Sequence, residues 1–199
     1  MQKQQTTIYF VRHAEAVKGF DPNRHRPLTD KGKKDCHLVT EFLKDKQISA
    51  VYSSPYKRAV DTISDFAKSI NTKIQLVEDF REREKGTRSQ SFAYMEYAER
   101  QWKDFSYKLP DGESLAETQA RNISALQKVL QQHCGENIVI GTHGQALGTI
   151  INHFDKSFDF ERKKTILNPF VVKMMFDGDE FVGYEMIDLF KLGERNENL

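Results

Sequence analysis

The chain has 199 residues, 38% of them hydrophobic, and its 30 basic and 29 acidic side chains leave a formal net charge of +1. This length predicts a single domain over residues 1–199, and the balanced charge argues against nucleic acids and membranes as partners. The apolar runs are too short for a signal peptide or a transmembrane helix, and two cysteines make no disulfide framework, so we expect a cytoplasmic protein.

Short strand-like runs alternate with helical patterns along the chain. Strands are predicted at residues 7–11, 49–53, 74–77 and 137–141. Helices are predicted at about 30–46, with Thr29 as N-cap, at 56–67, and at 115–130, where Ser114 and Glu117 form a capping box. A further helix begins at Gly144 and ends near His153, and residues 170–176 and 181–187 flank the turn of a terminal hairpin.

The alternation predicts an α/β fold, with one three-layer α/β/α domain built on a mostly parallel central sheet and a C-terminal antiparallel hairpin. Residues 84–112 fit neither pattern, and their polar, aromatic-rich composition predicts an irregular or helical insertion that covers one end of the sheet. Residues 162–164 are expected in a solvated turn, and the tail after Lys191 is expected to fray.

Arg12 and His13 directly follow the apolar run 8–11, at the carboxyl end of the first predicted strand. In open α/β sheets, ligands bind outside this edge. Arginine offers phosphate a permanently charged planar fork, and histidine can act as a nucleophile, an acid or a base. The pair alone is weak evidence for a ligand site, so we next considered the residues at the ends of the other predicted strands.

Two later strand ends carry residues of the same kind. Ser54 suits an N-cap and Pro55 the first helical position, which places Arg58 in the first turn of a helix. His143 follows another strand, and Gly144 permits close backbone approach at a helix start, where free N–H groups attract anions. Because parallel strands share one carboxyl edge, the sequence predicts a phosphate site built from Arg12, His13, Arg58 and His143.

These segments resemble the histidine phosphatase superfamily, also called the phosphoglycerate mutase-like family. The matching motifs run in the family's order: Arg12-His13-Ala14-Glu15, then residues 28–32, 53–59, 80–86, 110–114 and 142–144. The resemblance implies a phosphoglycerate mutase-like fold and His13 as the nucleophile that becomes phosphorylated. It implies that Arg12, Arg58 and His143 hold the phosphoryl oxygens, and that Glu82 is the acid/base carboxylate, with Glu84 and Glu15 as rival candidates.

Each implied role has a physical reason. Phosphoryl transfer needs in-line positioning and neutralised charge, which two arginines and a histidine supply without Mg²⁺, so we expect no metal and no cofactor. A neutral His13 must present a lone pair, so its other ring nitrogen should donate to a carbonyl or a carboxylate. Glu82 would protonate the leaving alkoxide and then deprotonate the attacking water.

The chain departs from the family pattern in two places and leaves two questions open. Ala14 replaces a common glycine, and Gly19 stands where mutase-like members often carry an asparagine that contacts phosphate. That contact is therefore absent or comes from elsewhere. Two sets of residues have alternative interpretations. A second anionic group could be bound by the basic residues Lys18, Arg24, His25 and Arg26, or these residues form an exposed basic loop. A specificity pocket could be lined by the aromatic residues Phe92, Tyr94, Tyr97 and Trp102, or these residues pack the insertion onto the core.

Residues 84–112 are the only predicted cover of the active site, whereas family mutases carry longer segments that close it. We therefore predict a metal-independent phosphatase that hydrolyses phosphate monoesters of a small molecule, or of a phosphoprotein, through a phosphohistidine intermediate. The alternatives are mutase-type phosphoryl transfer, phosphohistidine protein phosphatase activity, and phospho-ligand binding without turnover. The pairs Cys36-His37 and His133-Cys134 are not expected to bind a metal, because neighbouring residues on a helix point apart.

Overall fold

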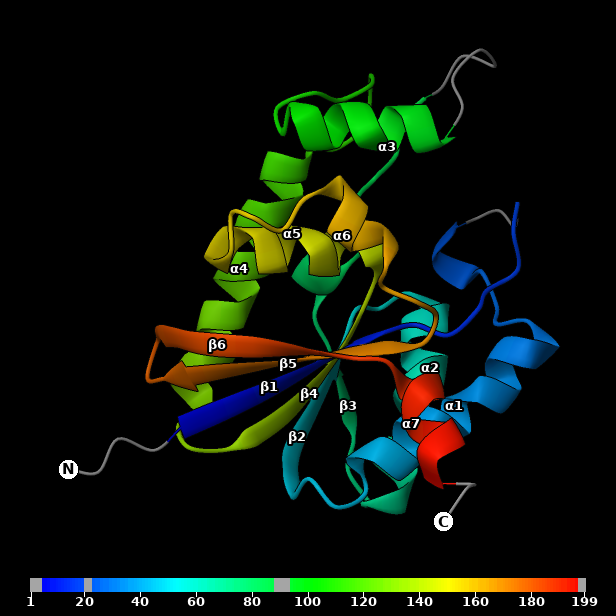
Figure 1. Cartoon of the computed structure of the whole chain (residues 1–199), viewed down its shortest axis with the longest axis vertical. Helices are drawn as coiled ribbons and strands as arrows, with labels where there is room; N and C mark the ends of the chain where they lie inside the picture. The colour runs from blue at the N-terminus through cyan, green and yellow to red at the C-terminus, as the bar shows by residue number, and fades with distance from the viewer. Residues whose placement is uncertain (1–4, 20–22, 88–93, 197–199) are drawn as a thin grey trace.

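The structure is a computed structural model that describes residues 5–19, 23–87 and 94–196 (Figure 1). Within these ranges, six strands form one sheet in the order β3-β2-β4-β1-β5-β6. They are β1 (Gln5–Arg12), β2 (Ile48–Ser53), β3 (Ile74–Leu76), β4 (Asn137–Thr142), β5 (Phe170–Asp177) and β6 (Glu180–Ile187). The strands β1 to β4 are parallel, whereas β5 is antiparallel to both of its neighbours, β1 and β6.

Helices cover both faces of this sheet (Figure 1). One face carries α1 (Asp30–Leu43), α2 (Lys57–Ser69) and α7 (Leu189–Asn196), and the other carries α4 (Leu115–Gln132), α5 (Gly144–Phe154) and α6 (Phe160–Lys164). The helix α3 (Tyr94–Lys103) lies beyond the N-terminal end of α4, away from the sheet. Two short 3₁₀ turns, η1 (Asn23–His25) and η2 (Glu78–Phe80), complete the elements.

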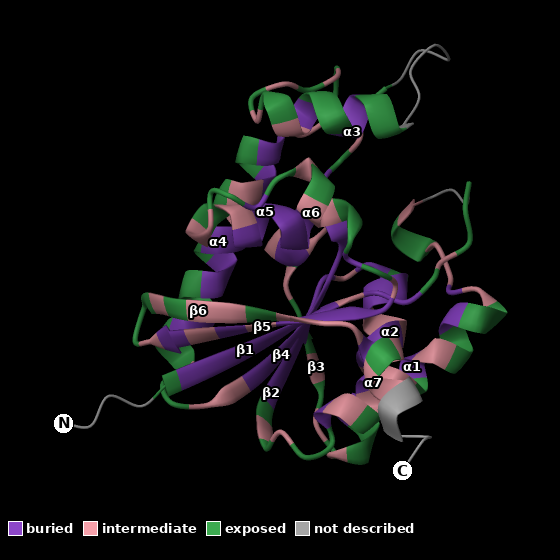
Figure 2. Ribbon diagram, in the orientation of Figure 1, coloured by how far each residue is buried: buried purple, intermediate pink, exposed green. Residues whose placement is uncertain are grey.

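The alternation of apolar residues in β1 explains why this strand is central. Ile8 and Phe10 pack into the core beneath α4 and α5, whereas Tyr9 and Val11 pack into the core beneath α1 and α2. Figure 2 shows the central strands buried along most of their length. Burying each large apolar side chain contributes about 1.5–3 kcal/mol, so β1 is held firmly from both faces. Its carboxyl end, where Arg12 and His13 lie, is therefore a fixed platform.

The predicted α/β architecture is confirmed, with a mostly parallel sheet, helices on both faces and a C-terminal antiparallel hairpin. Thr29 caps α1 as predicted, because its hydroxyl accepts from the Gly32 N–H at 3.0 Å. The capping box of Ser114 and Glu117 is also present at the start of α4. In the part of the chain that is described, no helix is both long and apolar enough to cross a membrane.

Three local predictions were wrong. Tyr56, not Ser54, occupies the N-cap position of α2, and the Ser54 hydroxyl contacts His143 instead. The chain after Lys191 continues as α7 to Asn196, because Leu189 is buried in the same core cluster as Leu43 and anchors the helix beside α1. Residues 162–164 belong to the helix α6 rather than to a solvated turn.

Candidate active site

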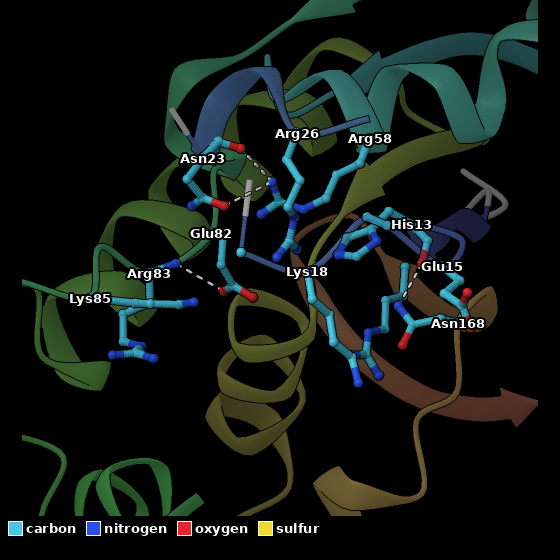
Figure 3. Close-up of a pocket in the computed structure, with 13 residues that line it drawn as sticks. His13, Glu15, Lys18, Asn23, Arg26, Arg58, Glu82, Arg83, Lys85 and Asn168 are labelled. Carbon is cyan, nitrogen blue, oxygen red and sulfur yellow. Dashed lines mark hydrogen bonds between the residues drawn. The ribbon is translucent and has the colours of Figure 1, made fainter. Parts of the chain in front are cut away.

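A cavity of about 560 Å³ opens at the carboxyl edge of the parallel strands (Figure 3). Among the described residues, six cationic side chains line it, against two carboxylates. The cations are Arg12, Lys18, Arg26, Arg58, Arg83 and Lys85, and the carboxylates are Glu15 and Glu82; His13, Asn23 and Asn168 also contribute. This excess of positive charge in a concave site favours an anionic ligand.

His13 follows β1 and is held by contacts on both sides. Its backbone N–H donates to the Thr142 carbonyl at 3.1 Å, and its Nδ1 lies 2.7 Å from the Ala14 carbonyl oxygen. Burial, followed by the neighbouring His143 and two arginines, holds the pKa of His13 well below its usual value of 6.5. A neutral ring that donates from Nδ1 to Ala14 keeps its lone pair on Nε2, which matches the predicted tautomer.

The Arg12 guanidinium lies between two segments of backbone. Its Nη1 donates to the carbonyl oxygens of Ile166 and Leu167, the second at 3.3 Å. On the other side is Gly144, the first residue of α5, where a Cβ atom would come within 3.0–3.2 Å of the guanidinium. A larger residue at this position would require the guanidinium to move away from the first turn of α5 by a few tenths of an ångström.

Arg58 is the second residue of α2 and is 1% exposed. Its Nη1 donates to the backbone oxygen and to Oδ1 of Asn23, at 2.9 and 3.3 Å, whereas its Nε has no hydrogen-bond partner among the described residues. Burial and the nearby Arg26 lower the pKa of Arg58 to about 10, which leaves it charged at neutral pH. A buried cation with a free N–H group is suited to bind an anion.

His143, directly before α5, is fully buried next to His13, and the two ring centroids lie 5.3 Å apart. Its Nε2 lies 2.7 Å from the Ser54 hydroxyl, which accepts the Tyr56 N–H at 3.3 Å. The Ser54 proton is therefore available to Nε2, and a neutral His143 carries its own proton on Nδ1. In the described part of the chain Nδ1 has no partner. Burial and Arg58 hold the pKa of His143 well below 6.5.

Glu82 is fixed at the N-terminal end of α5 by backbone N–H groups. Its Oε1 accepts from Arg83 at 2.9 Å and from Ala146 at 3.0 Å, and its Oε2 accepts from Gln145 at 3.1 Å. Burial raises its pKa, but these hydrogen bonds and two arginine charges outweigh burial and lower the pKa to about 2. The carboxylate is therefore ionised at neutral pH.

The rival carboxylates are placed differently from Glu82. Glu15 is exposed, its Oε1 accepts from the Thr29 hydroxyl at 2.9 Å, and it lies on the far side of His13 from Glu82 (Figure 3). Glu84 is exposed and does not line the cavity. Among the three, Glu82 alone both lines the cavity and is fixed by backbone donors at a helix start.

The predicted basic loop divides into two pairs. Lys18 and Arg26 line the cavity, in agreement with a role in anion binding. Arg24 instead pairs with Glu78 through two contacts of 2.7 and 2.8 Å, and His25 is exposed and does not line the cavity. The loop therefore presents two cations to the site and two residues to the outside.

Two asparagines that the sequence did not single out also belong to the site. Asn168 donates from Nδ2 to the His13 carbonyl at 2.8 Å, and Asn23 contacts Arg58; both line the cavity. Gly19 lines the cavity and has no side chain that could contact a phosphate. No spacing in the sequence marks them, because Asn23 begins the short 3₁₀ turn η1 and Asn168 lies in an irregular segment.

The aromatic residues of the insertion pack rather than line the cavity, as far as the structure describes them. Tyr97 is fully buried and contacts the ring of Tyr107 and the guanidinium of Arg83. Trp102 donates from Nε1 to the Gln145 side chain at 2.9 Å. Phe92 and the Tyr94 side chain lie outside the described residues. Of the described residues between 84 and 112, Lys85 alone lines the cavity, so the covering role of the insertion stays a prediction.

Comparisons with known proteins agree with this geometry. Residues 8–186 match the family model described as histidine phosphatase superfamily (branch 1). The chain is 35% identical over 191 residues to phosphoglycerate mutase-like protein 4 of Arabidopsis thaliana, covering 87% of this chain and 81% of that protein. It is 30% identical over 165 residues to a metal-independent phosphoserine phosphatase of the same plant, covering 75% and 69%. The solved structure of YhfR from Bacillus stearothermophilus superposes with a TM-score of 0.72 at 26% identity, covering 89% of this chain and 94% of that chain.

Proposed function

Because the chain belongs to branch 1 of the histidine phosphatase superfamily, we propose that it hydrolyses phosphate monoesters through a phosphohistidine intermediate on His13. One observation supports this proposal most directly. His13 Nδ1 lies 2.7 Å from the Ala14 carbonyl, so the lone pair of Nε2 is available within a group of cationic side chains. A neutral imidazole surrounded by arginines is the arrangement that an attack on a phosphoryl group requires.

In the first step the His13 Nε2 forms a bond to phosphorus while the bond from phosphorus to the ester oxygen breaks. Arg12, Arg58 and the Nδ1–H of His143 stabilise the charge on the equatorial oxygens, and fixed donors of this kind contribute about 3 kcal/mol each. Glu82 then passes a proton to the leaving oxygen. Since Glu82 is ionised without substrate, it must first gain that proton, which the nearby phosphoryl charge favours by raising the carboxyl pKa.

In the second step water attacks the phosphohistidine. Glu82, now without its proton, accepts one from this water, the bond between Nε2 and phosphorus breaks, and inorganic phosphate leaves. General acid and base catalysis by one carboxylate typically accelerates each step about 10² to 10⁴-fold. His13 returns to its neutral form, and the cycle needs no metal because the arginines supply the positive charge and the neutral His143 supplies a hydrogen-bond donor.

We favour hydrolysis over transfer to a second substrate because a mutase must keep water from its phosphohistidine. In the described part of residues 84–112, Lys85 alone lines the cavity, which supports access of water. The substrate that we propose is a phosphorylated small molecule, and a phosphoprotein is the alternative. The two cysteines, Cys36 and Cys134, are both free, in keeping with the proposed cytoplasmic location.

The test is hydrolysis of p-nitrophenyl phosphate in EDTA, comparing the wild type with His13→Ala and with His25→Ala as a matched control on an exposed histidine. We expect only His13→Ala to lose activity, and alkaline quenching with mass spectrometry to detect phosphate on His13. Activity that depends on added metal would reject the mechanism, and binding without turnover would favour a recognition module. Phosphate transfer between 2,3-bisphosphoglycerate and 3-phosphoglycerate without net release would instead identify a mutase.

A further inference from the structure

Thr62 is a buried residue of α2 whose hydroxyl contacts the backbone next to His13. It lies one helical turn after Arg58 and is 1% exposed. Its Oγ1 accepts the backbone N–H of Ala14 at 2.9 Å and donates to the Arg58 carbonyl at 2.7 Å. One hydroxyl therefore joins Ala14, 48 positions earlier in the chain, to the helix that carries Arg58.

This arrangement differs from the usual one for a threonine inside a helix. Such a residue often donates only to the carbonyl one turn before it, and that bond alone does not stabilise the helix. Thr118 in α4 is an example, because it is fully buried and donates to the Ser114 carbonyl at 2.9 Å. Among the described residues the Thr118 hydroxyl has no hydrogen bond to another element, whereas the Thr62 oxygen also receives an N–H group from outside its helix.

The Ala14 N–H depends on this acceptor because Ala14 is fully buried. A buried N–H group without an acceptor is costly, since water cannot reach it. Neighbouring backbone groups are held by other elements: the His13 N–H donates to Thr142 at 3.1 Å, and the His13 carbonyl accepts from Asn168 at 2.8 Å. Thr62 supplies the corresponding contact from α2.

The position of the Ala14 backbone determines how the His13 ring is oriented. The Ala14 carbonyl accepts from His13 Nδ1 at 2.7 Å, so a shift of Ala14 would move the acceptor that fixes the tautomer. Because Thr62 also contacts the Arg58 carbonyl, it fixes the backbones that carry His13 and Arg58 relative to each other. Both side chains line the same cavity (Figure 3), and phosphoryl transfer depends on such alignment.

We propose that Thr62 is a positioning residue that holds His13 in its reactive tautomer and at a fixed place relative to Arg58. The inference rests on the proposed function, and it adds to the residues that the reaction needs one that does not line the cavity. Thr62 touches no reacting atom and acts through the backbone of Ala14 and Arg58. Its loss should therefore slow alkyl and aryl phosphates equally, in contrast to the loss of an acid that protonates the leaving group.

The test compares Thr62→Val, which keeps the shape of the side chain without the hydroxyl, with Thr62→Ser, which keeps the hydroxyl. We expect Thr62→Val to lower kcat about 10- to 100-fold on p-nitrophenyl phosphate and on an alkyl phosphate alike, as the misplacement of a reacting group does. Thr62→Ser should retain most of the wild-type rate. Thr118→Val is the matched control, because it removes a buried threonine hydroxyl that bonds only within its own helix among the described residues, and it should keep the wild-type kcat.

Nitrogen NMR of the His13 ring measures the positioning without turnover. The wild type should show the proton on Nδ1, and Thr62→Val should show a mixture of the two tautomers, while Thr62→Ser and Thr118→Val keep the wild-type spectrum. A folded Thr62→Val with the wild-type tautomer would overturn the inference, whatever its rate or thermal stability. A wild type with the proton on Nε2 would instead reject the proposed nucleophile itself. Should Thr62→Val not fold, Thr62→Ala replaces it, with the same expected spectrum and the same contradicting result.

Discussion

The carbonyl oxygen of Ala14 lies 2.7 Å from Nδ1 of His13, and this contact directs Nε2 to the cavity. Because burial and nearby positive groups hold the His13 pKa well below 6.5, the ring stays neutral as the pH falls through 6.5. We expect NMR spectra of the His13 ring to show the neutral Nδ1–H form at pH 5.5, whereas the same ring in urea-unfolded protein titrates near 6.5. A folded-state midpoint at or above 6.5 would contradict the proposed nucleophile.

Replacing Glu82 by glutamine tests its acid/base role. The amide keeps the shape of the side chain but cannot exchange a proton, so hydrolysis of an alkyl phosphate should fall about 10² to 10⁴-fold. p-Nitrophenyl phosphate should be slowed far less, because its leaving group departs without a proton. The measurement is kcat on both esters, with Glu84→Gln as a control outside the cavity. Equal slowing of the two esters would remove Glu82 as the acid.

Arg121 fixes the segment that carries Glu82, although it does not line the cavity. Its Nη1 donates to the carbonyls of Asp79 and Arg81, both at 2.8 Å, and its Nη2 to that of Glu82 at 3.2 Å. The same guanidinium pairs with both oxygens of Glu113 at 2.9 Å. Arg121 is therefore a positioning residue for Glu82, and a planar fork is needed to reach all of these acceptors.

We expect Arg121→Lys to lower kcat for alkyl esters about 10-fold and to cost about 1–3 kcal/mol in the free energy of unfolding, because partly buried carbonyls lose their donors. The informative readout is the rate ratio of alkyl to aryl esters, which should fall in the same direction as in Glu82→Gln. If stability drops while this ratio stays at the wild-type value, Arg121 has only a structural role.

The gathering of Arg12, His13, Arg58 and His143 was predictable because it depends on strand order alone. Each lies at or just beyond the carboxyl end of a parallel strand, or in the first turn of the following helix, and such ends share one edge of the sheet. The burial of β1 on both faces was also predictable, because alternate residues of a strand face opposite sides of the sheet and here both sides are apolar. Predictions from local patterns such as these hold in the folded protein because the tertiary contacts favour the same structure.

Other features depend on contacts that no local pattern records. Lys163 was expected in a solvated turn, but it packs against α5, where its Cγ would lie 3.1 Å from a Cβ atom added to Gly148. Burial and the nearby Arg12 lower the pKa of Lys163 to about 8. The Ser54 hydroxyl was expected only to cap α2, but it also contacts His143, a partner 89 positions away. Likewise two of the three backbone N–H groups that hold the Glu82 carboxylate come from the start of α5, more than sixty residues downstream.

Gly144 permits the close contact between α5 and the Arg12 guanidinium. We therefore expect Gly144→Ala to weaken phosphate binding without destabilising the helix. A Cβ there would lie 3.0 Å from Arg12 Nη2 and 3.1 Å from Cζ, while the carbonyls of Ile166 and Leu167 hold the fork on its other side. The displaced fork should weaken vanadate or phosphate inhibition about 10-fold, comparable to the loss of one charge-assisted hydrogen bond.

The same substitution should not destabilise the helix itself, because alanine is favoured over glycine by about 0.5–1 kcal/mol in helices. Thermal unfolding and the vanadate inhibition constant therefore provide two independent readouts for Gly144→Ala. Gly193→Ala on α7 is the control, since its added Cβ would meet only Leu38 at an ordinary 3.5 Å. Wild-type vanadate inhibition in Gly144→Ala would show that phosphate binding does not depend on the position of Arg12 against α5, and Arg12 would then lose its proposed role as a phosphoryl ligand.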